Sequence, residues 1–242
     1  MRSKLVYVLP VHNEEKVLAA NVGRLTSYLE RWPDAQVFLV ENGSKDGSWE
    51  LSRTLEGGTG VQVRAFQEPN AGIGYAYHRG LAEAVEQFGP APSRWAVLTA
   101  ADLPFGFSDL EAAMVDLEGS AARILVGSKA HPQSQIDRSF KRKMMSAAYR
   151  LARRAAIGMR VGDSQGSVFL RLDLASALLP KIEARGFFYS TELCHFAERA
   201  GETIVELPVV LEEQQRESTV RPARDSLAMA RELMRLRAHE KK

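Results

Sequence analysis

Short apolar runs alternate with segments of helical periodicity along the first 130 residues, and this alternation restricts the fold more than any other feature. The runs that predict strands are 4–10, 35–42, 61–66, 95–102 and 122–129. The segments between them that predict helices are 13–31, 46–55, 74–88 and 108–118. Strands that are apolar along their whole length are typical of parallel sheets buried on both faces. The pattern therefore predicts an α/β fold, with a mostly parallel sheet and helices on both faces.

The pattern changes after about residue 130. The segments that follow are a basic amphipathic stretch (137–160), a polar turn (162–167), a helix (173–184), a strand within 203–213 and a last basic helix (224–242). No repeat, linker or low-complexity segment interrupts the chain. We therefore expect a single domain over residues 1–242, with a first half at 1–130 and a second at 131–242.

Charge and cysteine content exclude several function classes. The 242 residues carry a formal net charge of +2, which gives no reason to expect a nucleic-acid partner. Cys194 is the only cysteine, so an intrachain disulfide is excluded and a reducing compartment is favoured. The five histidines lack metal-ligand spacing, which argues against zinc. With no signal peptide and no apolar stretch of ~20 residues, we expect a cytoplasmic protein, soluble or peripheral at the inner membrane face.

Polar turns follow four of the predicted strands, where ligands bind in open α/β sheets. Glu41 and Asn42 end the second strand, before two glycines, and can bind a base or a ribose. The alternative is an ordinary strand–helix turn with a Ser or Asp cap. The glycine-rich turn "NAGIGYA" (70–76) suits close approach by a phosphate-bearing ligand. It lacks the spacing of dinucleotide-binding and P-loop motifs.

In combination these turns are specific to one protein family. The segments "LPVHNEE", "VENGSKDGS", "NAGIGYAYHRGLAEA" and "LTAADLP", in this order and spacing, resemble the family 2 glycosyltransferases, which have a GT-A, Rossmann-like fold. The later segments "VGSK", "GDSQGS", "FFYSTELCHFAERAG" and "ELPVVLEEQQREST" resemble the branch of dolichyl- and polyprenyl-phosphate mannose and glucose synthases. The resemblance implies inverting transfer of a hexose from a nucleotide-diphosphate sugar, such as UDP-glucose or GDP-mannose, to a phosphate-bearing acceptor such as polyprenyl phosphate. It assigns the nucleotide sugar to the first half and the acceptor to the second.

The resemblance also implies a donor site. Its nucleotide-sugar-binding residues would be Pro10, His12, Glu14, Glu41, Asn42, Gly72 and Ala101. Asp102 matches the last Asp of the D-x-D metal motif, whose first Asp is replaced by Ala100. Magnesium often takes only one or two protein carboxylates beside substrate phosphates, so Asp102 can still hold Mg²⁺ or Mn²⁺. The alternative is that Asp102 caps a turn and the enzyme is impaired.

The acceptor side follows from the same resemblance. Lys129, Arg138 and Gln165 would meet the acceptor phosphate, and Asp163 and Glu192 are the further catalytic candidates. Glu192 is either a general base or an acid at a helix N-terminus. A phosphate acceptor is already ionised at neutral pH and needs no strong base. Ser190 and Thr219 depart from the branch pattern, which has Asp and Lys there. His195, one turn after Glu192, is expected on the helix surface.

The basic stretch gives two interpretations. Phe140, Met144, Ala148, Leu151, Ala152 and Ala155 recur at helical spacing, and basic residues, including Lys141–Lys143 and Arg153, fill the rest. Such a helix lies on a membrane surface, or its apolar face packs on the sheet.

Two other functions stay open: transfer to a soluble acceptor, and a weakly catalytic nucleotide-sugar-binding subunit that needs a membrane partner. Ala100 and Ser190 favour the subunit.

Overall fold

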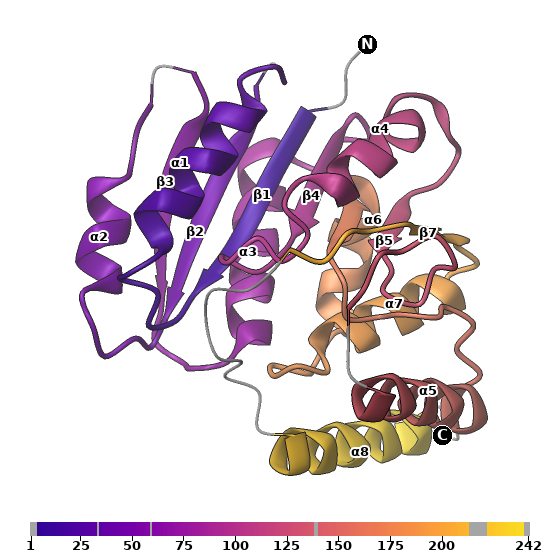
Figure 1. Cartoon of the computed structure of the whole chain (residues 1–242). Coiled ribbons are helices and arrows are strands. Elements are labelled where there is room, and N and C mark those ends of the chain that lie inside the picture. Colours follow the sequence, from indigo (N-terminus) through magenta and orange to yellow (C-terminus); the bar gives the residue numbers. More distant parts are fainter. Residues whose placement is uncertain (1–3, 33, 59, 138–139, 213–221, 240–242) are drawn as a thin grey trace.

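The computed structural model describes residues 4–32, 34–58, 60–137, 140–212 and 222–239 (Figure 1). Within these residues one sheet has the order β3-β2-β1-β4-β6-β5-β7. Its strands are β1 (Lys4–Val11), β2 (Gln36–Asn42), β3 (Gln62–Glu68), β4 (Arg94–Leu98), β5 (Ile124–Gly127), β6 (Val168–Arg171) and β7 (Ile204–Leu207). Strands β1 to β4 are mutually parallel, and β5 is parallel to β7. The predicted mostly parallel sheet is confirmed.

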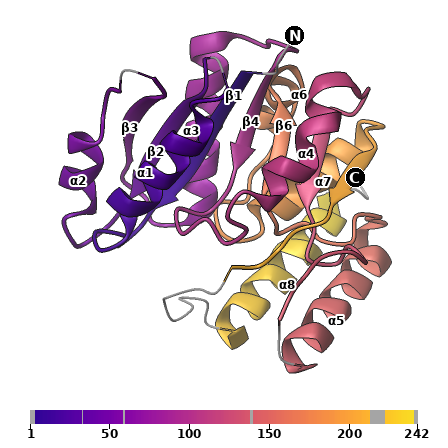
Figure 2. The same ribbon diagram turned by 45° about the horizontal axis from the view of Figure 1, so that its top comes forward.

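Helices cover both faces of the sheet (Figures 1 and 2). One face carries α3 (Ile73–Phe88), α6 (Leu172–Leu178) and α7 (Tyr189–Arg199); the other carries α1 (Leu18–Leu29), α2 (Ser48–Thr54) and α4 (Ser108–Gly119). Strand β1 shows why two cores form. Val6 and Val8 enter one apolar cluster while Leu5 and Leu9 enter the other, and all four are fully buried. Successive strand side chains point to opposite faces, so a wholly apolar strand serves both cores.

The helices α5 (Phe140–Ile157) and α8 (Pro222–His239) lie side by side in both ribbon views and contact one another (Figures 1 and 2). They sit past α7, away from α1 and α2. Much of α5 is exposed: the exposed fractions of Met144 and Leu151 are 57% and 68%. The apolar face predicted for this stretch is therefore only partly used for packing.

Several element limits differ from the sequence-based expectation. The first helix begins at Leu18 rather than near Asn13, because residues 12–17 form a loop bound to the turn after β2. The strand predicted at 95–102 ends at Leu98, which leaves Asp102 in the following turn. Strand β6, which the apolar pattern did not separate from its turn, pairs antiparallel with β4 and β5. Strand β6 ends at Arg171 and α6 begins at Leu172, so no turn residue marks where the strand ends.

Candidate functional site

The carboxyl ends of β1, β2, β3 and β4 meet at one edge of the sheet, because these neighbouring strands are parallel. The loops that follow them carry the predicted donor-site residues. The edge is therefore the place where the predicted side chains can act together.

The first two loops are bound to each other. The amide of Asn13 donates to Ser44 Oγ at 3.0 Å, and the amide of Lys45 donates to Asn13 Oδ1 at 2.8 Å. The amide of Glu14 donates to Ser48 Oγ at 2.8 Å. Asn13 has a positive φ of 56°, a conformation that Asn tolerates better than most residues. These contacts fix the backbone on which Glu14 and its neighbours stand.

Glu41 and Asn42 differ in what their side chains already bind. Glu41 is 3% exposed, and its Oε1 accepts the amide of Ser44 at 2.5 Å. Asn42 is 2% exposed, and its Oδ1 is buried with no hydrogen bond from any described residue. The carbonyl oxygen of Asn42 lies 2.9 Å from Nδ1 of the exposed His12. A buried acceptor without a partner is costly. Asn42 Oδ1 is therefore the better candidate to accept a hydrogen bond from a ligand, whereas Glu41 holds the turn in shape.

The glycine-rich turn is shaped by protein backbone. Gly72 has a φ of 146°, which favours glycine. A Cβ atom at position 74 would lie 2.5 Å from the carbonyl carbon of Arg185. The carbonyl oxygen of Arg185 also accepts the amide of Tyr75 at 3.2 Å, in the first turn of α3. The backbone of Arg185 is a close neighbour that requires these glycines, and the approach of a phosphate to the same turn stays a prediction.

Asp102 lies in the turn that follows β4. The pKa of Tyr77 on α3 is raised by burial and further by the negative charge of Asp102, so the carboxylate is near this ring. The preceding Ala101 is 3% exposed and packs in the core, where it offers a ligand little but backbone. The described residues contain no group of three or more His, Cys, Asp or Glu that could hold a metal ion. Asp102 thus fits a metal site only where substrate oxygens supply most of the ligands.

A second cluster gathers residues of the predicted acceptor side. Lys129 Nζ lies 3.1 Å from Asp163 Oδ2 and donates to the carbonyl oxygen of Gln165 at 2.7 Å. The amide of Lys129 donates to the same Asp163 oxygen at 3.0 Å. Burial alone would raise the pKa of Asp163, but Lys129 and the backbone amides hold it below its ordinary value. Asp163 is therefore a paired carboxylate that holds Lys129.

Two residues outside the set of predicted site residues support this cluster. Glu206 of β7 accepts Ser128 Oγ at 2.5 Å and the amides of Gly162 and Asp163 at 2.8 and 3.2 Å. Arg153 of α5 donates to the carbonyl oxygen of Gly162 at 3.0 Å. Arg153 is 2% exposed, although the amphipathic pattern grouped it with the solvent-facing basic residues. A charged residue within a basic stretch gives no signal of such burial.

Glu192 is committed to contacts within the protein. It is 2% exposed, and its Oε2 accepts the amides of Glu183 and Ala184 at 2.8 and 2.6 Å. Its Oε1 accepts Nη2 of Arg235 on α8 at 2.9 Å. A carboxylate with both oxygens bound in this way suits positioning better than general base catalysis. His195, expected on the helix surface, is 1% exposed.

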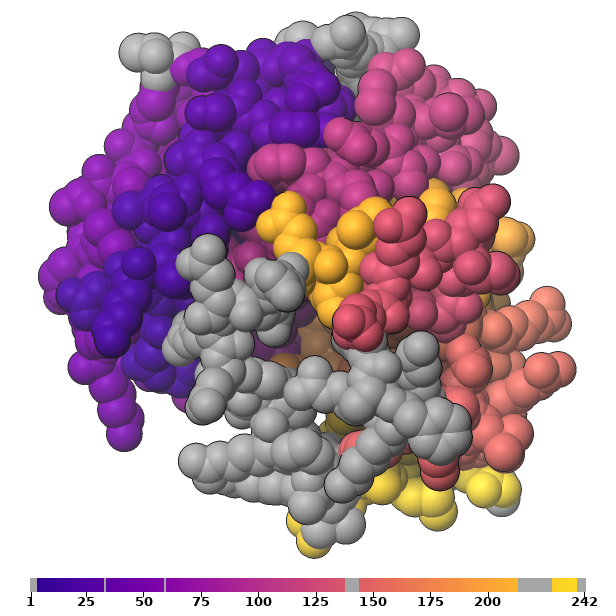
Figure 3. Space-filling model, in the orientation of Figure 1, coloured from indigo at the N-terminus to yellow at the C-terminus, as the bar shows by residue number. Residues whose placement is uncertain are grey.

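The segment after β7 reaches the loop that carries Asp102. The amide of Glu212 donates to the carbonyl oxygen of Pro104 at 2.9 Å, and its carboxylate pairs with Arg24 of α1 at 3.1 Å. In Figure 3 the orange-yellow residues of this segment lie between the indigo N-terminal part and the red residues near 130. The segment thus ties the second half of the chain to the first.

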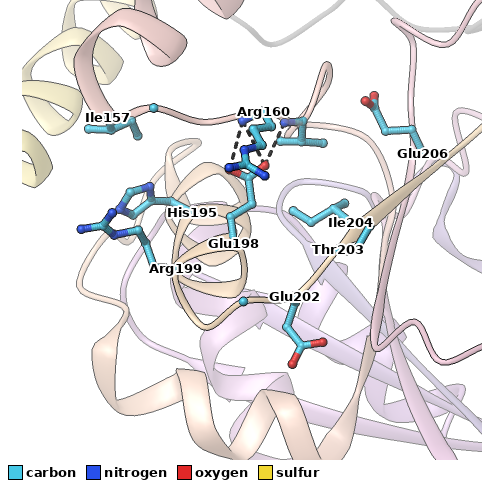
Figure 4. A pocket seen from close by; sticks show the side chains of 12 residues that line it. Ile157, Arg160, His195, Glu198, Arg199, Glu202, Thr203, Ile204 and Glu206 are labelled. Atoms are coloured by element: carbon cyan, nitrogen blue, oxygen red, sulfur yellow. Dashed lines mark hydrogen bonds between the residues drawn. The ribbon is translucent and has the colours of Figure 1, made fainter.

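A cavity of about 450 Å³ lies between the end of α5, α7 and β7, and Glu206 of the second cluster is part of its lining (Figure 4). Its lining includes Arg160, Arg199 and Glu198, and none of the predicted site residues. Glu198 accepts the amides of Arg160 and Val161 at 3.0 and 2.8 Å. The carboxylate therefore holds the turn between α5 and β6 in place.

Some predicted residues lie outside what the structure describes. Arg138 and Thr219 are not among the described residues, and neither are the side chains of Lys141, Arg142 and Lys143. Pro10 is half-buried near the end of β1. Among the described residues no helix is long and apolar enough to cross a membrane.

Comparison with known proteins places the chain in a family. Residues 7–179 match the model of glycosyl transferase family 2. An undecaprenyl-phosphate mannosyltransferase from Micrococcus luteus is 24% identical over an alignment of 224 residues, which covers 88% of this chain and 85% of that protein. A polyprenol monophosphomannose synthase from Mycolicibacterium smegmatis is 22% identical over 217 residues, covering 88% of this chain and 78% of that protein.

Solved structures support the same fold. Glucosyl-3-phosphoglycerate synthase from Mycobacterium tuberculosis in complex with UDP matches 96% of this chain and 78% of its own, with 18% identity and a TM-score of 0.63. The same enzyme with Mn²⁺, UDP-glucose and phosphoglyceric acid matches 98% of this chain and 79% of its own, with 18% identity and a TM-score of 0.65. The family model spans well over half of the chain, so the chain belongs to glycosyl transferase family 2, as its motifs predicted, and is a glycosyltransferase.

Proposed function

We propose that this glycosyltransferase transfers a hexose, with inversion, from a nucleotide-diphosphate sugar to polyprenyl phosphate. The observation that carries the proposal is the meeting of the loops after β1, β2 and β4 at one sheet edge, with buried Asn42 Oδ1 and Asp102 among them. The names of the two bacterial relatives support the acceptor, since both refer to a polyprenyl phosphate or its mannose derivative. UDP-glucose and GDP-mannose are the donors to test.

In the proposed donor site, Asn42 and His12 face the nucleoside, and Glu41 keeps their turn in shape. Pro10, Glu14, Gly72 and Ala101 contribute mainly through backbone position. Asp102 would hold Mg²⁺ or Mn²⁺ together with the donor diphosphate. A divalent cation there would neutralise the charge that develops on the departing nucleotide diphosphate.

In the proposed acceptor site, Lys129 meets the acceptor phosphate, and Asp163 holds the ammonium group in place. Gln165 lies beside them, with its carbonyl oxygen on the ammonium group. The phosphate nucleophile is ionised at neutral pH, so the reaction needs no strong base, which agrees with the occupied carboxylate of Glu192. The half at 1–130 would thus hold the donor and the half at 131–242 the acceptor.

Calorimetry of UDP and GDP, with Mg²⁺ or Mn²⁺ and with EDTA, tests the metal and donor assignments. We expect tighter binding with metal in wild-type protein. Asp102→Asn should lose the metal dependence because an amide keeps the shape but lacks the charge, and Ala100→Asp should strengthen it by restoring a second carboxylate. Identical binding with metal and with EDTA in all three proteins would contradict a metal at Asp102.

Transfer assays with labelled donors test the acceptor. Label should move to a short-chain polyprenyl phosphate in wild-type protein and should move far more slowly in Lys129→Gln. If label moves only to a soluble phosphorylated acceptor, that molecule replaces polyprenyl phosphate as the proposed acceptor. Nucleotide-sugar binding without turnover on any acceptor would support the binding-subunit alternative.

A further inference from the structure

The inference begins at a buried charge network between helices. Glu192 of α7 receives the amides of Glu183 and Ala184 on one oxygen and Arg235 of α8 on the other. Arg235 also pairs with Glu183 and, at 2.8 Å, with Glu232. A buried carboxylate needs such partners, because losing one leaves an uncompensated charge. Arg235 therefore helps to hold the segment that starts at Glu183.

That segment reaches the glycine-rich turn. One residue beyond Ala184, the backbone of Arg185 presses on Gly72 and Gly74: a Cβ atom at position 72 would lie 2.8 Å from the carbonyl oxygen of Arg185. The same oxygen accepts the amide of Tyr75 at 3.2 Å. A shift of residues 183–185 would therefore move or release the first turn of α3.

The glycine-rich turn in turn lies close to the residue that follows β2. A Cβ atom at Gly43, which has a φ of +73°, would lie 3.3 Å from the Cβ atom of Ala71. Gly43 directly follows Asn42, whose buried Oδ1 has no hydrogen-bond partner among the described residues. A continuous series of neighbouring segments thus leads from Arg235 to the proposed nucleoside group. Tight contacts of this kind transmit displacement, because packed interiors deform little.

We propose that Arg235 is a positioning residue for nucleotide binding: through Glu192 it holds residues 183–185 against the glycine-rich turn and so sets the affinity of the donor site. The proposal rests on the proposed function, because it assumes that the nucleotide binds at this sheet edge. It makes the placement of α8, a helix far from the donor loops in sequence, a determinant of donor affinity.

Calorimetry of UDP and GDP in the presence of Mg²⁺ tests the role, with Arg235→Gln, Arg235→Lys and the control Arg237→Gln. Arg237 is an exposed arginine of the same helix. We expect Arg235→Gln to raise the Kd by about tenfold, a common size for coupling between sites. Arg235→Lys, which keeps a charge toward Glu192, should recover most of the affinity, and Arg237→Gln should leave the Kd within twofold.

Calorimetry also separates positioning from mere loss of folded protein. Misfolded protein that does not refold lowers the number of binding sites at unchanged Kd, whereas a misplaced turn raises the Kd at unchanged stoichiometry in a variant that thermal unfolding shows to be fully folded. An unchanged Kd in Arg235→Gln, or in Arg235→Met if the Gln variant does not fold, would overturn the positioning role alone. Wild-type protein that binds neither nucleotide would overturn the proposed function, and this role with it.

Discussion

Asp109 in the first turn of α4 is a buried acid outside the candidate site. It is 4% exposed, and its Oδ1 accepts the amide of Leu110 at 2.8 Å. Burial raises its pKa to about 6. Burial also raises the pKa of the neighbouring Tyr7 on β1, and the charge of Asp109 raises it further. The folded protein therefore carries an unfavourable negative charge here above pH 6.

Asp109→Asn should stabilise the protein at pH 7.5 and have little effect at pH 4. Between the unfolded pKa near 3.9 and the folded pKa, the native state binds the proton more tightly, so the penalty of Asp109 grows as pH rises. At 1.36 kcal/mol per pKa unit the gain at pH 7.5 is at most about 3 kcal/mol. Urea unfolding of both proteins at the two pH values measures it. An equal difference at both would contradict the raised pKa.

A substitution of Glu41, again a single residue, tests the proposed donor site. Glu41→Ala removes the acceptor of the Ser44 amide and should weaken UDP or GDP binding by about 1.5–3 kcal/mol. Glu41→Gln keeps an acceptor oxygen for that amide and should lose less. Calorimetry at constant Mg²⁺ compares them. Unchanged affinity in a folded Ala variant would contradict a donor site at the turn after β2.

At the scale of elements, the contact of α3 with the sheet depends on a glycine. Gly80 faces β1 and β2, where a Cβ atom would overlap Val8 and lie 3.2 Å from Val40 Cγ2. Gly23 in α1 is exposed and has nothing within 4 Å of the position of a Cβ atom. The two glycines thus sit in helices for opposite reasons: one admits close packing, and the other only adds backbone freedom.

The same substitution should therefore have opposite effects in the two helices. Gly80→Ala should destabilise the fold by about 1–3 kcal/mol through overpacking. Gly23→Ala should stabilise it by roughly 0.5–1 kcal/mol, because Ala favours the helix and restricts the unfolded chain. Thermal unfolding of both variants is the measurement. A stabilised Gly80→Ala protein would show that α3 is not packed as closely on β1 as described.

At the scale of the whole molecule, α5 and α8 form an exposed end. Met144 and Leu151, seven residues apart on α5, are exposed, as is Met234 of α8 at 60%. Arg150 and Arg154 are exposed on the same helix as the first two. Apolar and basic side chains together suit the surface of an anionic membrane. We propose that this end of the molecule contacts the membrane surface.

Replacing Lys141, Arg142 and Lys143 with Gln should weaken binding to vesicles that contain anionic lipid. At about 1 kcal/mol for each basic residue near the surface, the loss is about 3 kcal/mol in total. A control variant replaces Lys16, Arg31 and Arg53 with Gln and so changes the net charge by the same amount. These three residues are exposed and lie in the first third of the chain. Vesicle sedimentation at low salt measures both. Wild-type protein that stays in the supernatant would contradict the membrane contact.

The sequence by itself determined the mostly parallel sheet, the helices on both of its faces and the family. These properties depend on local patterns: wholly apolar strands must be buried on both faces, and polar or glycine-rich turns mark where strands end. The turns after β1, β2 and β4 could therefore be identified as one edge before any contact was known.

Only the tertiary structure decided what the polar side chains bind. Nothing near Arg153 in the sequence signals that it is buried against Gly162, and nothing near Glu192 signals its partners on α8 and at Glu183. The glycines at 72 and 74 carry a local signal of close approach, but the approaching group, Arg185, lies more than a hundred residues away. Burial and pairing depend on which distant segments meet in space, and periodicity along the chain records only which side of an element is apolar.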